Sequence, residues 1–133
     1  MVLVVAAALM DAEGRVLLAQ RPANKSLGGL WEFPGGKVEP GEAPEAALVR
    51  ELAEELAINV DACDLEPLTF VSWAYPDFHL LMPLWAVRRW RGEPRSVEAQ
   101  ALAWAWPSQM DRYPMPPADG PLVNWLQRHL APA

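Results

Sequence analysis

Apolar residues occur in two short runs near the start of the chain. Residues 2–9 and residues 15–20 are rich in Val, Leu and Ala, which is typical of buried strands. Residues 11–14, with the sequence DAEG, supply turn chemistry between the two runs. The pattern therefore predicts a β-hairpin at the beginning of the chain.

Further apolar runs predict three strands and a helix in the second half. Residues 68–75 and residues 78–90 are two apolar runs that we expect to form a second hairpin. Pro83 interrupts the second run, and because proline cannot donate to a strand ladder, we expect an edge position or a bulge there. Residues 99–104 predict another strand, and residues 121–130 repeat apolar residues at helical spacing.

The strongest helical pattern follows Gly35 and Gly36, which predict a turn after a short strand. At about 100° per residue, this helix would have one apolar side and one acidic side. The apolar side is predicted to comprise Ala46, Val49, Leu52, Ala53 and Leu56. The acidic side, nearly opposite, is predicted to comprise Glu51, Glu54 and Glu55.

The acidic side has two interpretations. Carboxylates at i, i+3 and i+4 repel one another by roughly a few tenths of a kcal/mol, so their surroundings must offset this repulsion. Solvent does so on an ordinary amphipathic helix. A cation such as Mg²⁺ does so in a metal site, because it takes oxygen ligands, often one or two carboxylates together with substrate phosphates.

Composition limits the classes of function. The 133 residues predict one domain, residues 1–133, with 52% hydrophobic and 21% charged residues. A net charge of -6 disfavours nonspecific nucleic-acid binding, which needs basic clusters. Cys63 is the single cysteine, which excludes an intramolecular disulfide and a cysteine metal cluster. The apolar start is too short for a membrane span, so no membrane partner is expected and the cytoplasm is the default location.

The segment from Gly36 through Glu42 to RELAEELAI, residues 50–58, resembles the motif of the Nudix hydrolases. These enzymes cleave nucleoside diphosphates linked to another group. The resemblance implies an α/β fold, the Nudix α/β/α sandwich with a small mixed sheet between helices. It also implies hydrolysis of a nucleoside triphosphate to the monophosphate and pyrophosphate. Ala57 departs from the family, which has glycine there, so a left-handed backbone at this position would be penalised by about 1 kcal/mol.

The resemblance implies a metal site on the acidic side of the helix. Its cofactor would be Mg²⁺, with Mn²⁺ as a substitute, and the segment EAQALAW would bring one more carboxylate as a fourth ligand or base. The implied catalytic residues are Glu51, Glu54, Glu55 and Glu98, which would bind the metal together with the carbonyl of Gly35. Glu42 and Arg50 would form a structural ion pair, with Gly36 as a further structural residue.

The segments LLAQRP, WEFPGGK and YPDFH resemble those of MutT-type proteins. In that type the arginine corresponding to Arg21 contacts the substrate phosphate. The aromatic residues of YPDFH lie near the nucleoside pocket in such proteins, although core or rim positions are the alternative. The implied substrate-binding residues are Arg21, Glu32, Phe33, Pro34, Gly35, Lys37, Tyr75, Phe78 and Asp119. For His79 we expect a structural role.

Asp119 leaves the identity of the base open. The MutT type has asparagine here, and an amide can donate to O6 of 8-oxoguanine and accept from its N7–H. An ionised carboxylate can only accept, which suits the amine of cytosine, whereas a buried protonated carboxyl can do both. We therefore expect 8-oxo-dGTP as the substrate, with CTP or oxidised pyrimidine nucleotides such as 5-hydroxy-dCTP as the rival. A Nudix-fold module that binds a nucleotide without cleaving it is a third hypothesis, and both monomer and homodimer remain open.

Overall fold

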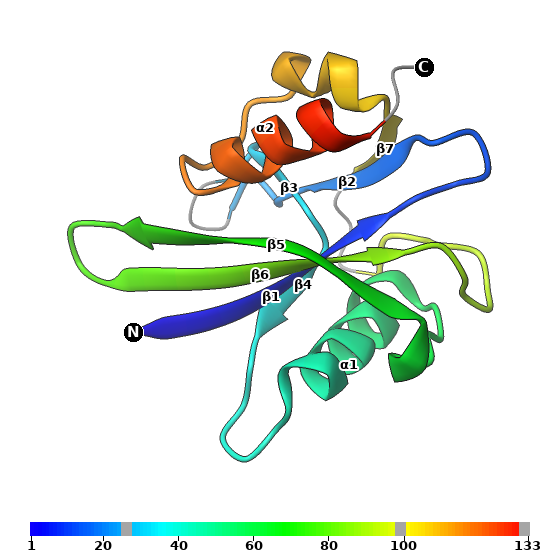
Figure 1. Cartoon of the computed structure of the whole chain (residues 1–133), viewed down its shortest axis with the longest axis horizontal. Helices are drawn as coiled ribbons and strands as arrows, with labels where there is room; N and C mark the ends of the chain where they lie inside the picture. The colour runs from blue at the N-terminus through cyan, green and yellow to red at the C-terminus, as the bar shows by residue number, and fades with distance from the viewer. Residues whose placement is uncertain (25–27, 98–100, 131–133) are drawn as a thin grey trace.

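The computed structural model describes residues 1–24, 28–97 and 101–130. Two sheets form its centre (Figure 1). The four-stranded sheet has the order β4-β1-β6-β5 and contains β1 (Val2–Leu9), β4 (Gly35–Lys37), β5 (Leu65–Ala74) and β6 (His79–Val87). The three-stranded sheet has the order β3-β2-β7 and contains β2 (Val16–Gln20), β3 (Trp31–Glu32) and β7 (Leu102–Ala105). The helices are α1 (Pro44–Leu56), α2 (Asp119–His129) and the 3₁₀ segments η1 (Ala62–Asp64) and η2 (Pro107–Arg112).

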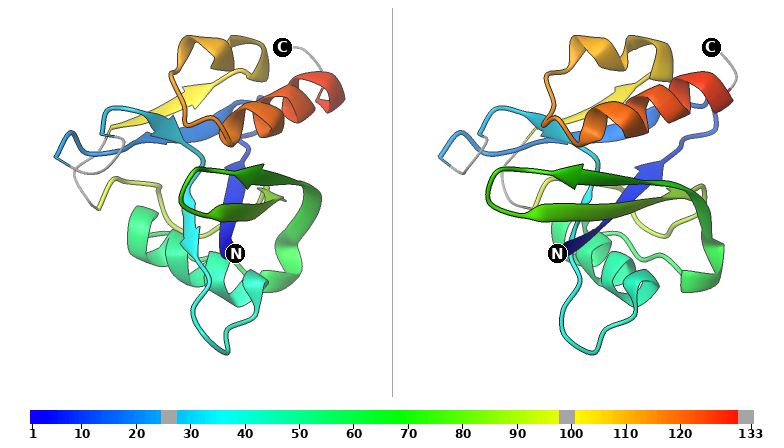
Figure 2. Two further views of the ribbon diagram at one scale, coloured as in Figure 1. Left: turned by 90° about the vertical axis from the view of Figure 1, so that its left-hand side faces the viewer. Right: turned by 60° about the vertical axis from the view of Figure 1, so that its left-hand side comes forward.

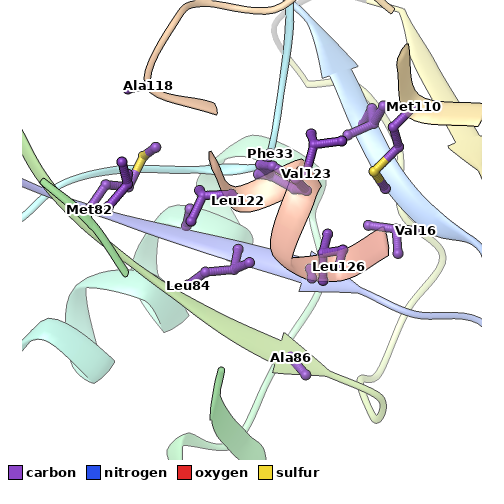
Figure 3. Close-up of a cluster of buried hydrophobic side chains, with 14 of the residues drawn as sticks. Val16, Phe33, Met82, Leu84, Ala86, Met110, Ala118, Leu122, Val123 and Leu126 are labelled. Atoms are coloured by element: carbon purple, nitrogen blue, oxygen red, sulfur yellow. The ribbon is translucent and has the colours of Figure 1, made fainter. Parts of the chain in front are cut away.

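Helices cover opposite faces of the four-stranded sheet, as Figures 1 and 2 show. Successive side chains of a strand point to opposite faces. Accordingly, Val5 and Leu9 of β1 pack in one buried cluster with Leu48, Leu52 and Leu56 of α1. The next residues along β1, Ala6 and Ala8, belong to a second cluster with Leu122 and Leu126 of α2 (Figure 3). The predicted α/β/α sandwich with a mixed sheet is confirmed, because β1 pairs parallel with β6 and antiparallel with β4. No helix within the described ranges is long and apolar enough to cross a membrane.

The predicted hairpin of the first two strands is wrong. β1 and β2 belong to different sheets, and the β-bridge between their ends in the described residues is the isolated pair Met10–Val16. The turn itself forms as expected, since Gly14 N–H donates to the carbonyl of Asp11 and the Arg15 amide donates to the Asp11 carboxylate. The strands separate after this turn because both edges of β1 are already occupied, one by β4 and the other by β6.

The second hairpin, β5–β6, forms as predicted, but the expectation for its proline is wrong. β6 is a central strand, and Pro83 pairs in register with Phe70 of β5. Its missing N–H is accommodated on the other side, where the ladder with β1 passes from the pair Leu3–Leu81 directly to Ala6–Leu84. The irregularity in the β5–β6 register lies in β5, between Pro67 and Thr69.

The first helix forms where the pattern predicts, with Pro44 at its start, but its buried face is rotated. Ala47 and Leu48 are buried, whereas Ala46 and Ala53 are exposed, so the predicted apolar side is partly wrong. The two leucines one and two turns later, Leu52 and Leu56, are buried as expected. The glycine pair also differs from expectation, because it forms the extended strand β4 rather than a turn. β1 determines both outcomes, since it takes β4 at its edge and α1 on its face.

Candidate active site

Strand β4 brings its glycines against the acidic side of α1. A Cβ atom built on Gly36 would overlap the carboxylate of Glu51, so this side chain fits only because residue 36 has none. A Cβ atom on Gly35 would overlap the backbone of Val5 in β1. The Gly35 amide donates to Glu55 Oε2 at 3.3 Å. The glycine pair therefore allows the strand to lie directly beside two carboxylates of the helix.

Arg50 links the carboxylates of this helix face. Its guanidinium makes two hydrogen bonds to Glu42, at 2.8 and 2.9 Å, and Nη1 donates to Glu51 at 2.9 Å and to Glu54 at 3.3 Å. Nη2 also donates to the Lys37 carbonyl at 3.1 Å. These hydrogen bonds hold the pKa of Glu42 down at about 2 and raise the pKa of Arg50. Arg50 thus supplies positive charge to the acidic face and ties α1 to the loop before it.

The donor set suits a hard cation, although the carboxylates are not gathered around one point. Glu51, Glu54 and Glu55 offer only oxygen atoms, which Mg²⁺ and Mn²⁺ prefer. Within the described part of the chain, no three His, Cys, Asp or Glu side chains are arranged to hold a metal ion. Glu51 and Glu54 instead accept hydrogen bonds from Arg50, whose positive charge offsets the repulsion between the two carboxylates. By type and by helix face, the residues fit a divalent cation.

The loop after β6 is attached to the end of α1. The Arg95 amide donates to the Leu56 carbonyl at 3.0 Å, and the Val97 amide donates to the Glu55 carbonyl at 3.2 Å. These bonds satisfy carbonyls that a helix end leaves without partners. The sequence carried no signal for this attachment, because backbone bonds of a loop depend on no side-chain type. Glu98, the predicted fourth carboxylate, lies outside the described residues.

A second polar group lies at the other side of the sheet. Arg21 Nη1 donates to the two oxygens of the Glu32 carboxylate at 3.2 and 3.4 Å. Burial nevertheless raises the pKa of Glu32, with Arg21 opposing that rise. Asp119, the first residue of α2, is 5% exposed, and its Oδ2 has no hydrogen-bond partner among the described residues. Burial, and secondarily the charge of Glu32, raises the pKa of Asp119 to about 7.

Aromatic residues of the β5–β6 turn complete this second group. The rings of Tyr75 and Phe78 have centroids 5.1 Å apart, and Phe78 is 44% exposed. The Tyr75 hydroxyl accepts a hydrogen bond from the Ala118 amide at 3.1 Å, which places the turn beside the start of α2. His79 bonds to Ser72 on the neighbouring strand at 2.6 Å, consistent with the structural role expected for it.

The predicted site residues thus fall into two groups within the described structure. One group lies along β4 and α1 and comprises Gly35, Gly36, Lys37, Glu42, Arg50, Glu51, Glu54 and Glu55. The other comprises Arg21, Glu32, Tyr75, Phe78 and Asp119. The buried residues Phe33 and Pro34 lie between them along the chain, with the Pro34 carbonyl bonded to the Ala7 amide at 2.8 Å. Ala118, whose amide donates to the Tyr75 hydroxyl, was not predicted, since an alanine backbone amide has no sequence signature.

Comparison with known proteins supports a common origin for this arrangement. The chain matches the family model of the NUDIX domain over residues 5–125. The CTP pyrophosphohydrolase of Escherichia coli (strain K12) is 40% identical over 130 residues, which cover 90% of this chain and 87% of the relative. The 8-oxo-dGTP diphosphatase of the same strain is 34% identical over 120 residues, covering 90% and 92%. A solved structure of MutT, from work on Aliivibrio salmonicida and Vibrio cholerae, is 28% identical with a TM-score of 0.81, covering 97% of this chain and 98% of that one.

The family match includes both groups of residues, from β1 to the middle of α2. The fold and the acidic helix agree with what the sequence motif implied, whereas the glycine pair forms strand β4 in place of the predicted turn. The chain belongs to the Nudix hydrolase family, in its MutT-like branch.

Proposed function

We propose that this protein is a Mg²⁺-dependent nucleoside triphosphate pyrophosphohydrolase that removes oxidised nucleotides from the nucleotide pool. Its principal substrate would be 8-oxo-dGTP, cleaved to 8-oxo-dGMP and pyrophosphate, which keeps the oxidised base from being incorporated during DNA replication. The observation that carries the choice of base is the buried carboxyl of Asp119 with its unpartnered Oδ2. The cytoplasm, where such nucleotides are used, is the proposed location, and the free nucleotide rather than a nucleic acid is the proposed partner.

The residues of β4 and α1 would hold the metal. Glu51, Glu54 and Glu55 supply carboxylates, the Gly35 carbonyl supplies a further oxygen, and Glu98 is proposed as the fourth carboxylate or base. Bound Mg²⁺, or Mn²⁺ in its place, would neutralise charge on the phosphate oxygens and lower the pKa of an attacking water. The hydrogen bond from Gly35 N–H to Glu55 and the close fit of Glu51 over Gly36 support this assignment. They hold two carboxylates beside the strand before any ligand arrives.

The second group would bind the nucleotide. Arg21 is proposed to contact a phosphate, and its present partner, Glu32, keeps the guanidinium beside the site. The remaining substrate contacts are assigned to Phe33, Pro34, Lys37, Tyr75 and Phe78. Asp119 in its neutral form can donate to O6 of 8-oxoguanine and accept from N7–H, as an asparagine would. Its burial favours this neutral form, because removing a carboxylate from water raises its pKa.

A rival substrate class is supported by one comparison and by the hydrogen-bonding chemistry of Asp119. The CTP pyrophosphohydrolase relative is 40% identical to this chain. When ionised, Asp119 is an acceptor only, and an acceptor matches the exocyclic amine of cytosine. CTP and 5-hydroxy-dCTP are therefore the alternative substrates, with the same metal site and the same bond cleaved.

Four nucleotides distinguish the proposals. We expect kcat/KM in Mg²⁺ to be highest for 8-oxo-dGTP when it is compared with dGTP, CTP and 5-hydroxy-dCTP, and we expect EDTA to abolish turnover. A preference for the cytidine nucleotides would replace the first substrate with the second. Tight binding of all four nucleotides without release of pyrophosphate would contradict both hydrolase proposals. It would instead support a module that binds a nucleotide without cleaving it. Light scattering of the same sample would determine whether it is a monomer or a homodimer.

A further inference from the structure

One side chain connects the β5–β6 turn to the start of α2. The Ala118 amide donates to the Tyr75 hydroxyl at 3.1 Å. Ala118 is the N-cap residue of α2 and has no capping side chain of its own. The first amides of a helix have no partner within the helix, so a side chain from elsewhere must satisfy them or water must do so. At this helix, the Tyr75 hydroxyl does so for Ala118.

The tyrosine is itself fixed in place. Its backbone amide donates to the Phe78 carbonyl at 2.9 Å and closes the turn between the two strands. Its ring centroid lies 5.1 Å from that of Phe78 and 6.5 Å from that of Trp73. The backbone and the neighbouring rings restrict the rotation of the Tyr75 side chain. Its hydroxyl therefore keeps a nearly constant position and can hold another group there, because little side-chain entropy remains to be lost.

The position of the Asp119 side chain depends on the Tyr75 hydroxyl more than that of an ordinary helix residue would. It follows Ala118 directly, and its carboxyl is buried with Oδ2 unpartnered among the described residues. No hydrogen bond to that oxygen fixes how deeply the side chain lies. Its depth is therefore determined by the backbone at the start of α2. Two local bonds hold that backbone, from the Asp119 amide to the Pro116 carbonyl at 3.0 Å and from the Gly120 amide to the Pro117 carbonyl at 3.1 Å, and the Tyr75 hydroxyl ties it to the β5–β6 turn.

We propose that Tyr75 is a positioning residue for base recognition, because its hydroxyl holds the first residue of α2 so that the Asp119 carboxyl meets the base at a fixed depth. This inference rests on the proposed function, in which Asp119 recognises the base. It assigns the Tyr75 hydroxyl to the protein rather than to the nucleotide. The aromatic ring remains available to the substrate.

A test without substrate compares Tyr75→Phe with Tyr113→Phe. Both changes remove one hydroxyl from a partly buried tyrosine, and the Tyr113 ring packs edge-on against Trp31 at 5.2 Å with no hydroxyl bond to the described residues. We expect Tyr75→Phe to speed hydrogen exchange of the Ala118 amide by about three- to tenfold, the range for loss of one neutral hydrogen bond. We also expect the pKa of Asp119, followed by carbon NMR, to fall toward its ordinary value as water reaches it. Tyr113→Phe should change neither, and an unchanged Ala118 exchange rate in Tyr75→Phe would overturn the proposal.

A second test uses the reaction. In Tyr75→Phe, KM for the preferred nucleotide should rise by about three- to tenfold with kcat preserved, and the ratio of kcat/KM between 8-oxo-dGTP and 5-hydroxy-dCTP should move toward one. A lower melting temperature with KM and that ratio unchanged would show a structural role only and would refute the positioning role. Failure of the proposed function looks different, because the wild-type protein would then cleave none of these nucleotides while the exchange and titration differences persist.

Discussion

The carboxylate of Glu51 occupies the space that a side chain at position 36 would need, so any side chain in place of Gly36 would displace this carboxylate. Arg50 Nη1 donates to the same carboxylate at 2.9 Å. Glu51 is therefore confined between β4 and its neighbour on the helix. Such confinement is expected of a catalytic or metal-binding group. The conformational entropy of the side chain is then lost on folding, so it need not be lost again when the ligand binds.

Gly36→Ala should impair activity more than stability. The added methyl group would displace the Glu51 carboxylate, and a misplacement of about 1 Å at a reacting site can cost about a hundredfold in kcat. Because the displaced atoms are the end of a flexible side chain, the free energy of unfolding should fall by no more than about 1 kcal/mol, the low end of the range for overpacking. Steady-state kinetics and urea denaturation measure the two effects. Gly120→Ala is the control, since its Cβ would meet nothing within 4 Å, and normal kcat in Gly36→Ala would contradict the role of Glu51.

Ala57→Gly should stabilise the protein. Ala57 follows the last turn of α1 with φ 58 and ψ 35, the left-handed conformation anticipated from its place in the motif. Glycine adopts this conformation without the steric cost of a Cβ atom, so the change should raise the free energy of unfolding by about 1 kcal/mol. Ala53→Gly, at an exposed position within the same helix, should lower it by a similar amount. Equal effects of the two changes would show that glycine is not specifically favoured at position 57.

The sequence predicted the elements and the acidic helix face, and it failed where an outcome depended on distant partners. Periodicity located α1 and the β5–β6 hairpin, since both are determined by nearby residues. It misassigned the first two strands as a hairpin, because turn chemistry between them does not reveal that β4 and β6 occupy both edges of β1. It also could not reveal that the charge of Glu32 helps to raise the pKa of Asp119, as these residues are far apart in the chain.

Glu42→Gln should alter how stability depends on pH. Hydrogen bonds from Arg50, then from the Glu39 amide, lower the pKa of Glu42 to about 2 in the folded protein. A lowered pKa means that this carboxylate stabilises the fold above its unfolded pKa, about 4.3, and that the contribution is lost as pH falls toward 2. The difference in unfolding free energy between wild type and Glu42→Gln should therefore be largest near pH 7 and shrink across that window. Urea denaturation from pH 2 to 7 measures it, with Glu45→Gln, at an exposed position in the first turn of α1, as the control.

Asp119 should make the preference between bases depend on pH. Its pKa of about 7 leaves it neutral below that pH, able to donate to O6 and accept from N7–H, and ionised above it, able only to accept. The ratio of kcat/KM for 8-oxo-dGTP to that for 5-hydroxy-dCTP should fall as pH rises from 6 to 8, in the range about one unit either side of the pKa. Effects of pH on the metal site apply to both substrates and cancel in this ratio. Asp119→Asn should keep the preference for 8-oxo-dGTP and remove its pH dependence; a sloping ratio in that variant would assign the titration to another group.

Because Asp119 has a raised pKa, it also affects stability in the opposite direction from Glu42. A carboxyl that prefers to be neutral in the folded state contributes most below its unfolded pKa, about 3.9, and this contribution is lost as pH rises through about 7. Asp119→Asn should therefore gain stability relative to wild type between these values and remain more stable at pH 8. Thermal melts of the two proteins at pH 4, 6 and 8 test the sign. A constant difference across this range would show that Asp119 is not buried in its neutral form.

Glu54→Gln tests the metal assignment through stability as well as rate. Glu54 has a 60% exposed side chain and contacts Arg50 at 3.3 Å, so replacing it with the isosteric amide should leave the metal-free melting temperature close to that of wild type. A ligand that binds only the folded form stabilises it by about 2.7 kcal/mol at a hundred times its Kd, so Mg²⁺ or Mn²⁺ should raise the melting temperature of the wild type. In Glu54→Gln that increase should be smaller and turnover should be lost. Normal activity in the variant would place the cation elsewhere. No shift of the wild-type melting temperature at millimolar metal would show that the folded protein binds no cation, and Glu54 would then be only a solvated side chain of α1.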